Sequence, residues 1–203
     1  MKTRWTMAGL FAVALAAGTS LGLHREGLIL RRIGQSEGVA PPSIGGAFAL
    51  TSHRGELVTD ASLRGRPFLM FFGFTHCPVV CPTTLFDVTD LLKEVGPDAD
   101  RLRAVFVTVD PERDTPEILA EYMRSFDERI LALSGTVAQT EAAVRAYGAE
   151  YRKVPTSGDS YTVDHTATVY VMDQEGRLAT TLDMHEPRET RLAKLRRVVG
   201  PQS

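Results

Sequence analysis

The stretch PFLMFFGFTHCPVVCP, residues 67–82, joins a run of apolar residues to two closely following cysteines. An apolar run of this length without alternation is typical of a strand buried on both faces of a parallel sheet. The next residues, 83–95, carry apolar side chains at helical spacing, at Leu85, Val88, Leu91, Leu92 and Val95. We therefore predict a strand at 67–74, a turn that contains both cysteines, and a helix at 83–95 that ends at Gly96-Pro97.

Downstream of this turn, strand and helix patterns alternate along the chain. We predict strands at 103–109 and 130–133, a helix from about Pro116 with Asp114 or Thr115 as its N-cap, and a helix at 136–147. Residues 166–172 and 177–182 are typical of an antiparallel hairpin, and 187–199 of a closing helix. This order indicates an α/β fold, a mixed sheet with flanking helices and an antiparallel edge. The thioredoxin-like fold is one such arrangement, although periodicity defines only the class.

The N-terminal residues differ from the rest of the chain. A short basic start is followed by residues 5–23, which contain no charged side chain and are about long enough to span a ~30 Å hydrocarbon core as a helix. We predict that residues 1–24 form a membrane anchor; a cleaved signal peptide is the alternative, since Ala14-Leu15-Ala16 offers a small-x-small cleavage site. Residues 25–43, which include Pro41-Pro42, are predicted to be a linker, and 44–203 the globular domain.

Composition narrows the classes of function. The net charge is −2, and no basic stripe indicates a nucleic-acid partner. The chain has two cysteines, too few for the disulfide framework of a small secreted protein. Both cysteines lie in one turn, which indicates a local chemical role.

The position and spacing of Cys77 and Cys81 favour thiolate chemistry. They follow a predicted strand and open a helix, and a helix N-terminus lowers a thiol pKa. Three residues separate them, and at helical i, i+4 spacing their Cβ atoms lie about 5–6 Å apart, wider than a disulfide prefers. Two thiolates that bind one metal ion tolerate this spacing. A disulfide stays open as an alternative, because Pro78 and Pro82 distort a helix here.

A third ligand has to come from elsewhere, and the chain has five histidines. We expect His24 and His53 to be solvated. His76 adjoins Cys77, but neighbours on an extended chain point in opposite directions. His185 precedes the closing helix. His165 lies at the start of a predicted hairpin strand, where a lone histidine is more often structural than a ligand.

Three motifs resemble one known family. GFTHCPVVCP, FVTVDPERDTPE and YTVDHTATVYVMD, in this order, are similar to the Sco/SenC family of copper chaperones for cytochrome c oxidase, and the similarity extends from about Gly46 to the closing helix. The resemblance implies a thioredoxin-like fold with an insertion, an N-terminal membrane anchor, and copper, Cu(I) or Cu(II), bound by Cys77, Cys81 and His165. It also implies cytochrome c oxidase subunit II as a partner, together with another periplasmic copper chaperone or thiol oxidoreductase.

One position departs from the family pattern. The family often has an acidic residue after the first Cys-Pro, where this chain has Val79. The ligands are unaffected, but a charge near the metal is absent. Asp164, beside His165, is expected either to orient the imidazole or to be a plain turn residue. Residues 110–114 are expected to end a strand and cap a helix.

Two functions follow from these residues. The first is a metallochaperone in the bacterial inner membrane, with a single membrane pass and the globular domain in the periplasm, that delivers copper to the binuclear centre of the oxidase. The alternative is a thiol–disulfide oxidoreductase in which Cys77 and Cys81 reduce the target's cysteines or sense redox state. A peroxiredoxin-like peroxidase is disfavoured, because a peroxidatic cysteine needs no second thiol four positions away.

Overall fold

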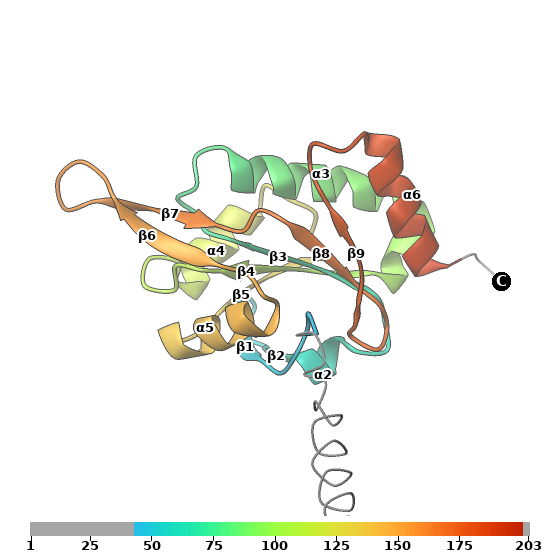
Figure 1. Ribbon diagram of the computed structural model, residues 1–203, viewed down its shortest axis with the longest axis horizontal. Helices are drawn as coiled ribbons and strands as arrows, with labels where there is room; N and C mark the ends of the chain where they lie inside the picture. The colour runs from blue at the N-terminus through green and yellow to red at the C-terminus, as the bar shows by residue number, and fades with distance from the viewer. Residues whose placement is uncertain (1–42, 201–203) are drawn as a thin grey trace, which may run out of the picture. The chain divides into compact units, whose positions relative to one another are not determined.

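The computed structural model describes residues 43–200, and its centre is a seven-stranded mixed sheet (Figure 1). In spatial order the strands are β2 (Leu57–Thr59), β1 (Ala49–Ser52), β5 (Ile130–Ser134), β4 (Arg103–Thr108), β3 (Phe68–Gly73), β8 (Val169–Met172) and β9 (Leu178–Leu182). β3, β4 and β5 run parallel, whereas β8, β9, β1 and β2 pair antiparallel at the two edges. The predicted α/β class with an antiparallel edge is therefore confirmed.

The helices lie on both faces of this sheet. They are α2 (Asp60–Leu63), α3 (Val80–Val95), the 3-10 helix η1 (Gly96–Arg101), α4 (Pro116–Met123), α5 (Val137–Ala146) and α6 (Arg188–Val199). In Figure 1, α3 and α6 lie above the sheet and α5 below it. Every residue of β3 is buried, as the unbroken apolar run predicts, because helices cover both of its faces.

The helix after the cysteine turn begins earlier than predicted. α3 starts at Val80, so Pro82 lies in its first turn and not before the helix. The first turn has no intrahelical partners for its N–H groups, so a proline there costs no hydrogen bond. Cys81 consequently belongs to the first turn of α3, and Cys77 to the loop that precedes the helix.

The antiparallel hairpin β6 (Tyr151–Pro155) and β7 (Tyr161–His165) forms a separate two-stranded sheet that no sequence pattern predicted. Strand periodicity is weak there, because four of the five residues of β7 and all of β6 are at least partly exposed. His165 therefore ends β7 and does not lie at the start of the predicted strand at 166–172. That strand is β8, which begins only at Val169 and pairs antiparallel with β9, as predicted.

The predicted membrane segment, residues 1–24, and the predicted linker up to Pro42 lie outside the described residues. Within residues 43–200, no helix is both long enough and apolar enough to cross a membrane. The boundaries at 24 and 43 remain predictions.

Candidate metal centre

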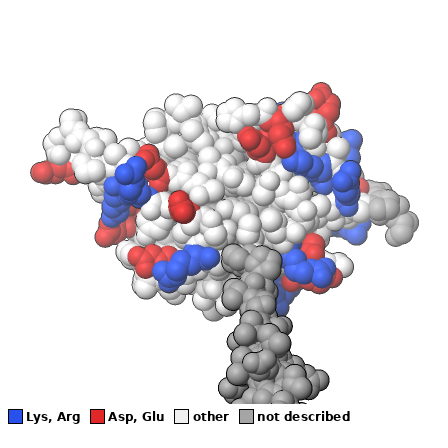
Figure 2. Space-filling view, in the orientation of Figure 1, with Lys and Arg blue, Asp and Glu red and all other residues white. Residues whose placement is uncertain are grey.

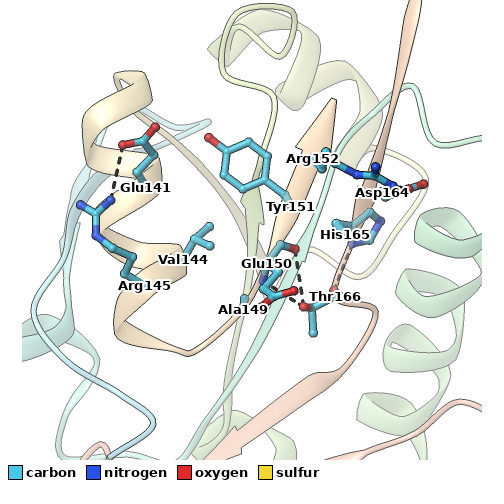
Figure 3. Close-up of a pocket in the computed structure, with 10 residues that line it drawn as sticks. All are labelled: Glu141, Val144, Arg145, Ala149, Glu150, Tyr151, Arg152, Asp164, His165 and Thr166. Atoms are coloured by element: carbon cyan, nitrogen blue, oxygen red, sulfur yellow. Dashed lines mark hydrogen bonds and ion pairs between the residues drawn. The ribbon is translucent and has the colours of Figure 1, made fainter. Parts of the chain in front are cut away.

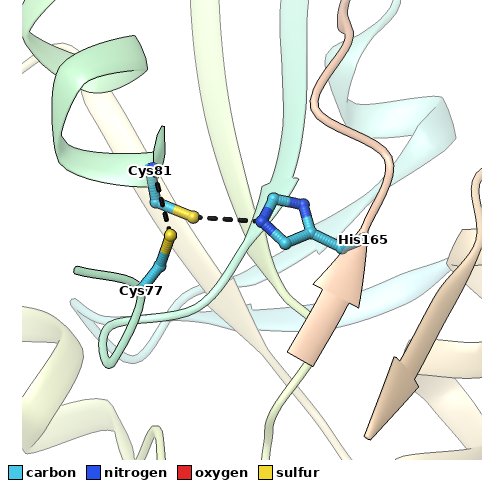
Figure 4. A group of neighbouring side chains, drawn as sticks. All are labelled: Cys77, Cys81 and His165. Carbon is cyan, nitrogen blue, oxygen red and sulfur yellow. Dashed lines mark hydrogen bonds between the residues drawn. The ribbon is translucent and has the colours of Figure 1, made fainter. Parts of the chain in front are cut away.

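Cys77, Cys81 and His165 lie together, although His165 is far from the cysteines in sequence (Figure 4). Their ligand atoms all lie within 4.8 Å of one another, and 3.3 Å separates Cys81 Sγ from His165 Nε2. Three ligand atoms about 2.3 Å from one ion in trigonal geometry lie about 4 Å apart. The cluster therefore has the dimensions of a three-coordinate metal site.

The start of α3 positions the two sulfur atoms differently. Val79 is the N-cap and its side chain makes no cap hydrogen bond. Instead the Cys81 N–H donates to Cys77 Sγ at 3.3 Å, so the sulfur takes the place of a capping oxygen. Cys81 is fully buried and Cys77 is partly exposed. One cysteine therefore lies in the core, and the other lies at its edge.

Glycine makes room for the buried sulfur. Gly73 ends β3, and a Cβ built there would lie 2.8 Å from Cys81 Sγ and 2.7 Å from Cε2 of Phe106. Both distances are shorter than ordinary contacts between such atoms, which begin near 3.5 Å. A side chain at position 73 would therefore occupy the space that the Cys81 sulfur uses.

The imidazole of His165 is held in one orientation. Its Nδ1 lies 3.0 Å from the carbonyl oxygen of Thr166, so Nδ1–H donates to that oxygen and Nε2 faces the sulfur atoms. The rings of Phe71 and Phe74 contact it edge-on, at centroid distances of 6.1 and 5.8 Å. This arrangement directs the Nε2 lone pair towards the sulfur of Cys81, the direction from which a metal ion would be bound.

Burial dominates the protonation of the site. It lowers the pKa of His165 below its ordinary value, so the ring stays neutral and ready to bind a cation. It raises the pKa of Cys81 far above its ordinary value, and the neighbouring Cys77 adds to that shift. The expectation that the helix N-terminus lowers the thiol pKa is wrong for Cys81, because desolvation of a thiolate outweighs the helix terminus. A bound cation compensates for that desolvation.

The other histidines of the described residues lie outside this cluster. The Nδ1 of His76 lies 3.1 Å from the hydroxyl of Thr75, and the ring of His185 pairs with Asp183 at 2.8 Å. His53 is half-buried and accepts the N–H of Ala132, so the expectation that it is solvated is wrong. His24 lies outside the described residues.

Asp164 does not orient the imidazole; its carboxylate pairs with Arg152 at 2.8 Å on the exposed side of the hairpin. This pair borders a groove of about 750 Å³ between α5 and the base of β6 and β7, which His165 also lines (Figure 3). On the opposite wall, Glu141 pairs with Arg145 at 3.4 Å. Glu150, a third acidic residue of the lining, forms no ion pair within the described residues. In Figure 4 the ring of His165 directs Nε2 towards the sulfur of Cys81.

The fold and the side-chain cluster define a thioredoxin-like protein in which two thiols and one imidazole are gathered as a candidate metal centre. The SCO1/SenC family model matches residues 36–200, and the chain belongs to that family. The human mitochondrial protein SCO2 homolog is 36% identical over 180 residues, which cover 87% of this chain and 67% of the human protein.

Two solved structures of relatives contain copper. ScoI of Bradyrhizobium japonicum with copper bound is 46% identical, with a TM-score of 0.73 over 77% of this chain and 99% of that chain. Yeast Sco1 with copper bound is 33% identical, with a TM-score of 0.72 over 78% of this chain and 89% of that chain. The fold of this chain is therefore that of copper-binding Sco proteins.

Proposed function

We propose that this chain is a copper metallochaperone for assembly of the binuclear copper centre of cytochrome c oxidase, with Cys77, Cys81 and His165 as the copper ligands. The observation that carries the proposal is the gathering of two sulfur atoms and one imidazole nitrogen within 4.8 Å. Two thiolates and an imidazole suit Cu(I) in trigonal geometry, and Cu(II) when an oxygen ligand joins them. The copper-bound structures of ScoI and Sco1 support copper over zinc, which accepts the same donors.

The exposure of the ligands supports transfer by ligand exchange. Cys77 is partly exposed, so a thiolate of the acceptor can reach a copper ion on its side, whereas Cys81 lies in the core. The acceptor sulfur binds, Cys77 leaves and takes up a proton, and the remaining ligands follow. Copper keeps its oxidation state throughout. The acceptor in this proposal is subunit II of the oxidase, and a further partner is another periplasmic copper chaperone or a thiol oxidoreductase.

Replacement of His165 by alanine tests this function. In the full-length protein, we expect His165→Ala to lower copper affinity at least about tenfold, while the fold and the reactivity of both thiols stay unchanged. Copper affinity is measured by competition with a chromogenic chelator, and thiol reactivity by titration with a disulfide reagent. His185→Ala is the matched control, because it removes an exposed imidazole outside the cluster.

The second candidate function is thiol–disulfide exchange, and the observation that favours it is the pair of free, neighbouring cysteines. Exchange needs both thiols and has no chemical use for His165. Cells with His165→Ala should therefore assemble little active oxidase at limiting copper if the chain delivers copper. Normal assembly in those cells, together with failure of Cys77→Ser and Cys81→Ser, would mean that thiol exchange is the essential act.

We further propose that residues 1–24 anchor the chain in the bacterial inner membrane by a single pass, with the globular domain in the periplasm. The uncharged run at 5–23 supports an anchor, and a relative from Rickettsia prowazekii, 37% identical over 136 residues, supports a bacterial setting. We expect the mature protein to stay with the membrane during alkaline carbonate washing. A mature N-terminus near residues 17–24 would instead indicate a cleaved signal peptide.

A further inference from the structure

The turn at 110–114, between β4 and α4, contains two aspartates whose side chains are completely buried, Asp110 and Asp114. A buried carboxylate costs several kcal/mol unless hydrogen bonds compensate for its lost hydration. Only part of the predicted role for this turn is confirmed, because Thr115 alone caps α4. The two carboxylates point elsewhere, and their partners belong to the two segments that carry the metal ligands.

Asp114 binds the loop that carries the cysteines. Its carboxylate accepts the backbone N–H of Thr75 at 3.0 Å and the hydroxyl of Thr75 at 2.6 Å. A third donor, the hydroxyl of Thr108 at the end of β4, lies 2.5 Å away. Because Thr75 is two residues before Cys77, these bonds fix the point where the chain leaves β3 for the cysteine loop.

Asp110 and Arg113 bind the strand that carries the histidine. The hydroxyl of Tyr161 donates to Asp110 at 2.8 Å, and Arg113 Nη1 donates to the carbonyl oxygen of Tyr161 at 3.0 Å. The guanidinium of Arg113 also lies 3.8 Å from the centroid of the Tyr161 ring, and its Nε pairs with Asp110. Tyr161 is the first residue of β7 and His165 the last, so these contacts fix one end of a five-residue strand.

This attachment is important because β6 and β7 form a sheet of their own. Backbone hydrogen bonds fix the register of β3, and hence the start of the cysteine loop, but β7 pairs only with β6 in the described part of the chain. The position of His165 relative to the sulfur atoms therefore depends on the short link from His165 to β8, which pairs with β3, and on side-chain contacts of the His165 ring and of its strand. Those of Asp110 and Arg113 with Tyr161 are short, buried on the Asp110 side, and partly ionic.

We propose that the 110–114 turn is a positioning element that sets the separation between the cysteine pair and His165. Asp114 acts through Thr75 on the cysteine loop, and Asp110 and Arg113 act through Tyr161 on His165. This inference rests on the proposed copper function, because its effect is expressed in the affinity and geometry of the copper site. None of these side chains has to touch the metal.

The part of the proposal that concerns β7 predicts an effect on copper affinity that is present only when His165 is present. Tyr161→Phe keeps the ring under Arg113 but removes the hydroxyl that donates to Asp110, and Arg113→Gln removes the ionic contact. In the full-length protein we expect each change to lower copper affinity about three- to tenfold, the usual effect of one lost hydrogen bond of this kind. The same changes made in the His165→Ala background should have no further effect, because the ligand they position is gone.

The part of the proposal that concerns the cysteine loop predicts an effect on copper affinity that does not depend on His165. Thr75→Val removes the hydroxyl that donates to Asp114, and its effect on copper affinity should persist in the His165→Ala background. Arg152→Ala is the matched control, since it breaks the exposed pair with Asp164 on the same hairpin and should leave copper affinity unchanged. The Cu(II) electron paramagnetic resonance spectrum gives a second readout: nitrogen coupling should weaken in Tyr161→Phe and stay in Thr75→Val.

The outcomes separate the two proposals. A wild-type protein that does not bind copper overturns the proposed function and, with it, this inference. If wild type binds copper and His165→Ala weakens binding, but Tyr161→Phe and Arg113→Gln match wild type, the positioning role alone is wrong. Equal losses for Tyr161→Phe with and without His165 would also overturn it, because they would reflect general destabilisation. Tyr161→Phe is conservative enough to fold if Arg113→Gln does not.

Discussion

Gly73→Ala should damage the proposed copper site through one added methyl group. The new Cβ would lie 2.7 Å from Cε2 of Phe106, 2.8 Å from Cys81 Sγ and 3.3 Å from Cε1 of Phe71. Ordinary carbon contacts begin near 3.5 Å, so the phenyl ring and the sulfur must each move by about 0.7 Å or more. Phe106 is fully buried between neighbouring side chains and has little room to move.

The size of the loss in copper affinity depends on which atoms move to make room for the new methyl group. Overpacking of a close-packed core costs about 1–3 kcal/mol, which is shared between the backbone and the displaced side chains. In the copper-bound state the Cys81 sulfur is held at a bond length of about 2.3 Å, so it cannot relax freely. If that state bears most of the strain, copper affinity falls about 5- to 150-fold. In the absence of copper the sulfur can turn away, and the thermal midpoint falls by only a few degrees.

The assay compares Gly73→Ala with Gly135→Ala in the full-length protein. A Cβ at Gly135 would lie 2.7 Å from Leu50 and 2.9 Å from Gln139, so it is equally crowded but has no metal ligand beside it. Both variants should lose stability on thermal unfolding, while only Gly73→Ala should lose copper affinity in chelator competition. Wild-type copper affinity in Gly73→Ala would refute the argument that Gly73 makes room for the Cys81 sulfur.

Two further predictions concern pH and the exposed rim of the site. Because burial lowers the pKa of His165, a proton should compete with copper for its imidazole only below the ordinary imidazole pKa of about 6.5. The copper affinity of wild type divided by that of His165→Ala, both measured by chelator competition, should therefore stay constant from pH 8 to 6.5 and fall at lower pH. A ratio that already falls between pH 8 and 7 would contradict a lowered pKa of His165. Val79 is 64% exposed in a stretch without charged residues, 67–86, and Figure 2 shows an uncharged area over the start of α3. Val79→Asp should therefore leave copper affinity within about twofold of wild type and make the rate of copper transfer to the acceptor depend on salt, as stopped-flow transfer at two ionic strengths would reveal.

The buried part of the fold could be predicted because one physical effect dominates it. The apolar runs at 67–74 and 103–109 became β3 and β4, and the alternating helices followed from capping residues and helical spacing. Thr136, for example, forms a capping box with Gln139 at the start of α5, as a Thr-x-x-Gln sequence indicates. The boundaries of these elements differ from the predictions by only a few residues.

The hairpin that carries His165 could not be predicted in the same way. β6 contains Arg152 and Lys153, and β7 contains one buried residue, Val163, so no apolar alternation marks either strand. Their stability comes from pairing with each other and from contacts with the 110–114 turn, which are tertiary and leave no local signal. The cysteines were evident as a pair, but spacing gave no reason to select His165 over four other histidines; that came from the family resemblance.

The unequal burial of the two cysteines bears on how such a site can both hold and release copper. Cys81 lies in the core, 3.3 Å from His165 Nε2, and burial makes its thiolate costly without a cation. Copper binding must therefore displace a proton from a thiol that holds it tightly, and this competition lowers the net affinity of a well-formed site. Cys77 is partly exposed and its sulfur accepts the N–H of Cys81, so an incoming thiolate can replace it first. In the proposed transfer, once Cys77 has left, reprotonation of Cys81 would favour the departure of copper. The same burial that shapes the site thus opposes irreversible binding, as a protein that passes copper on requires.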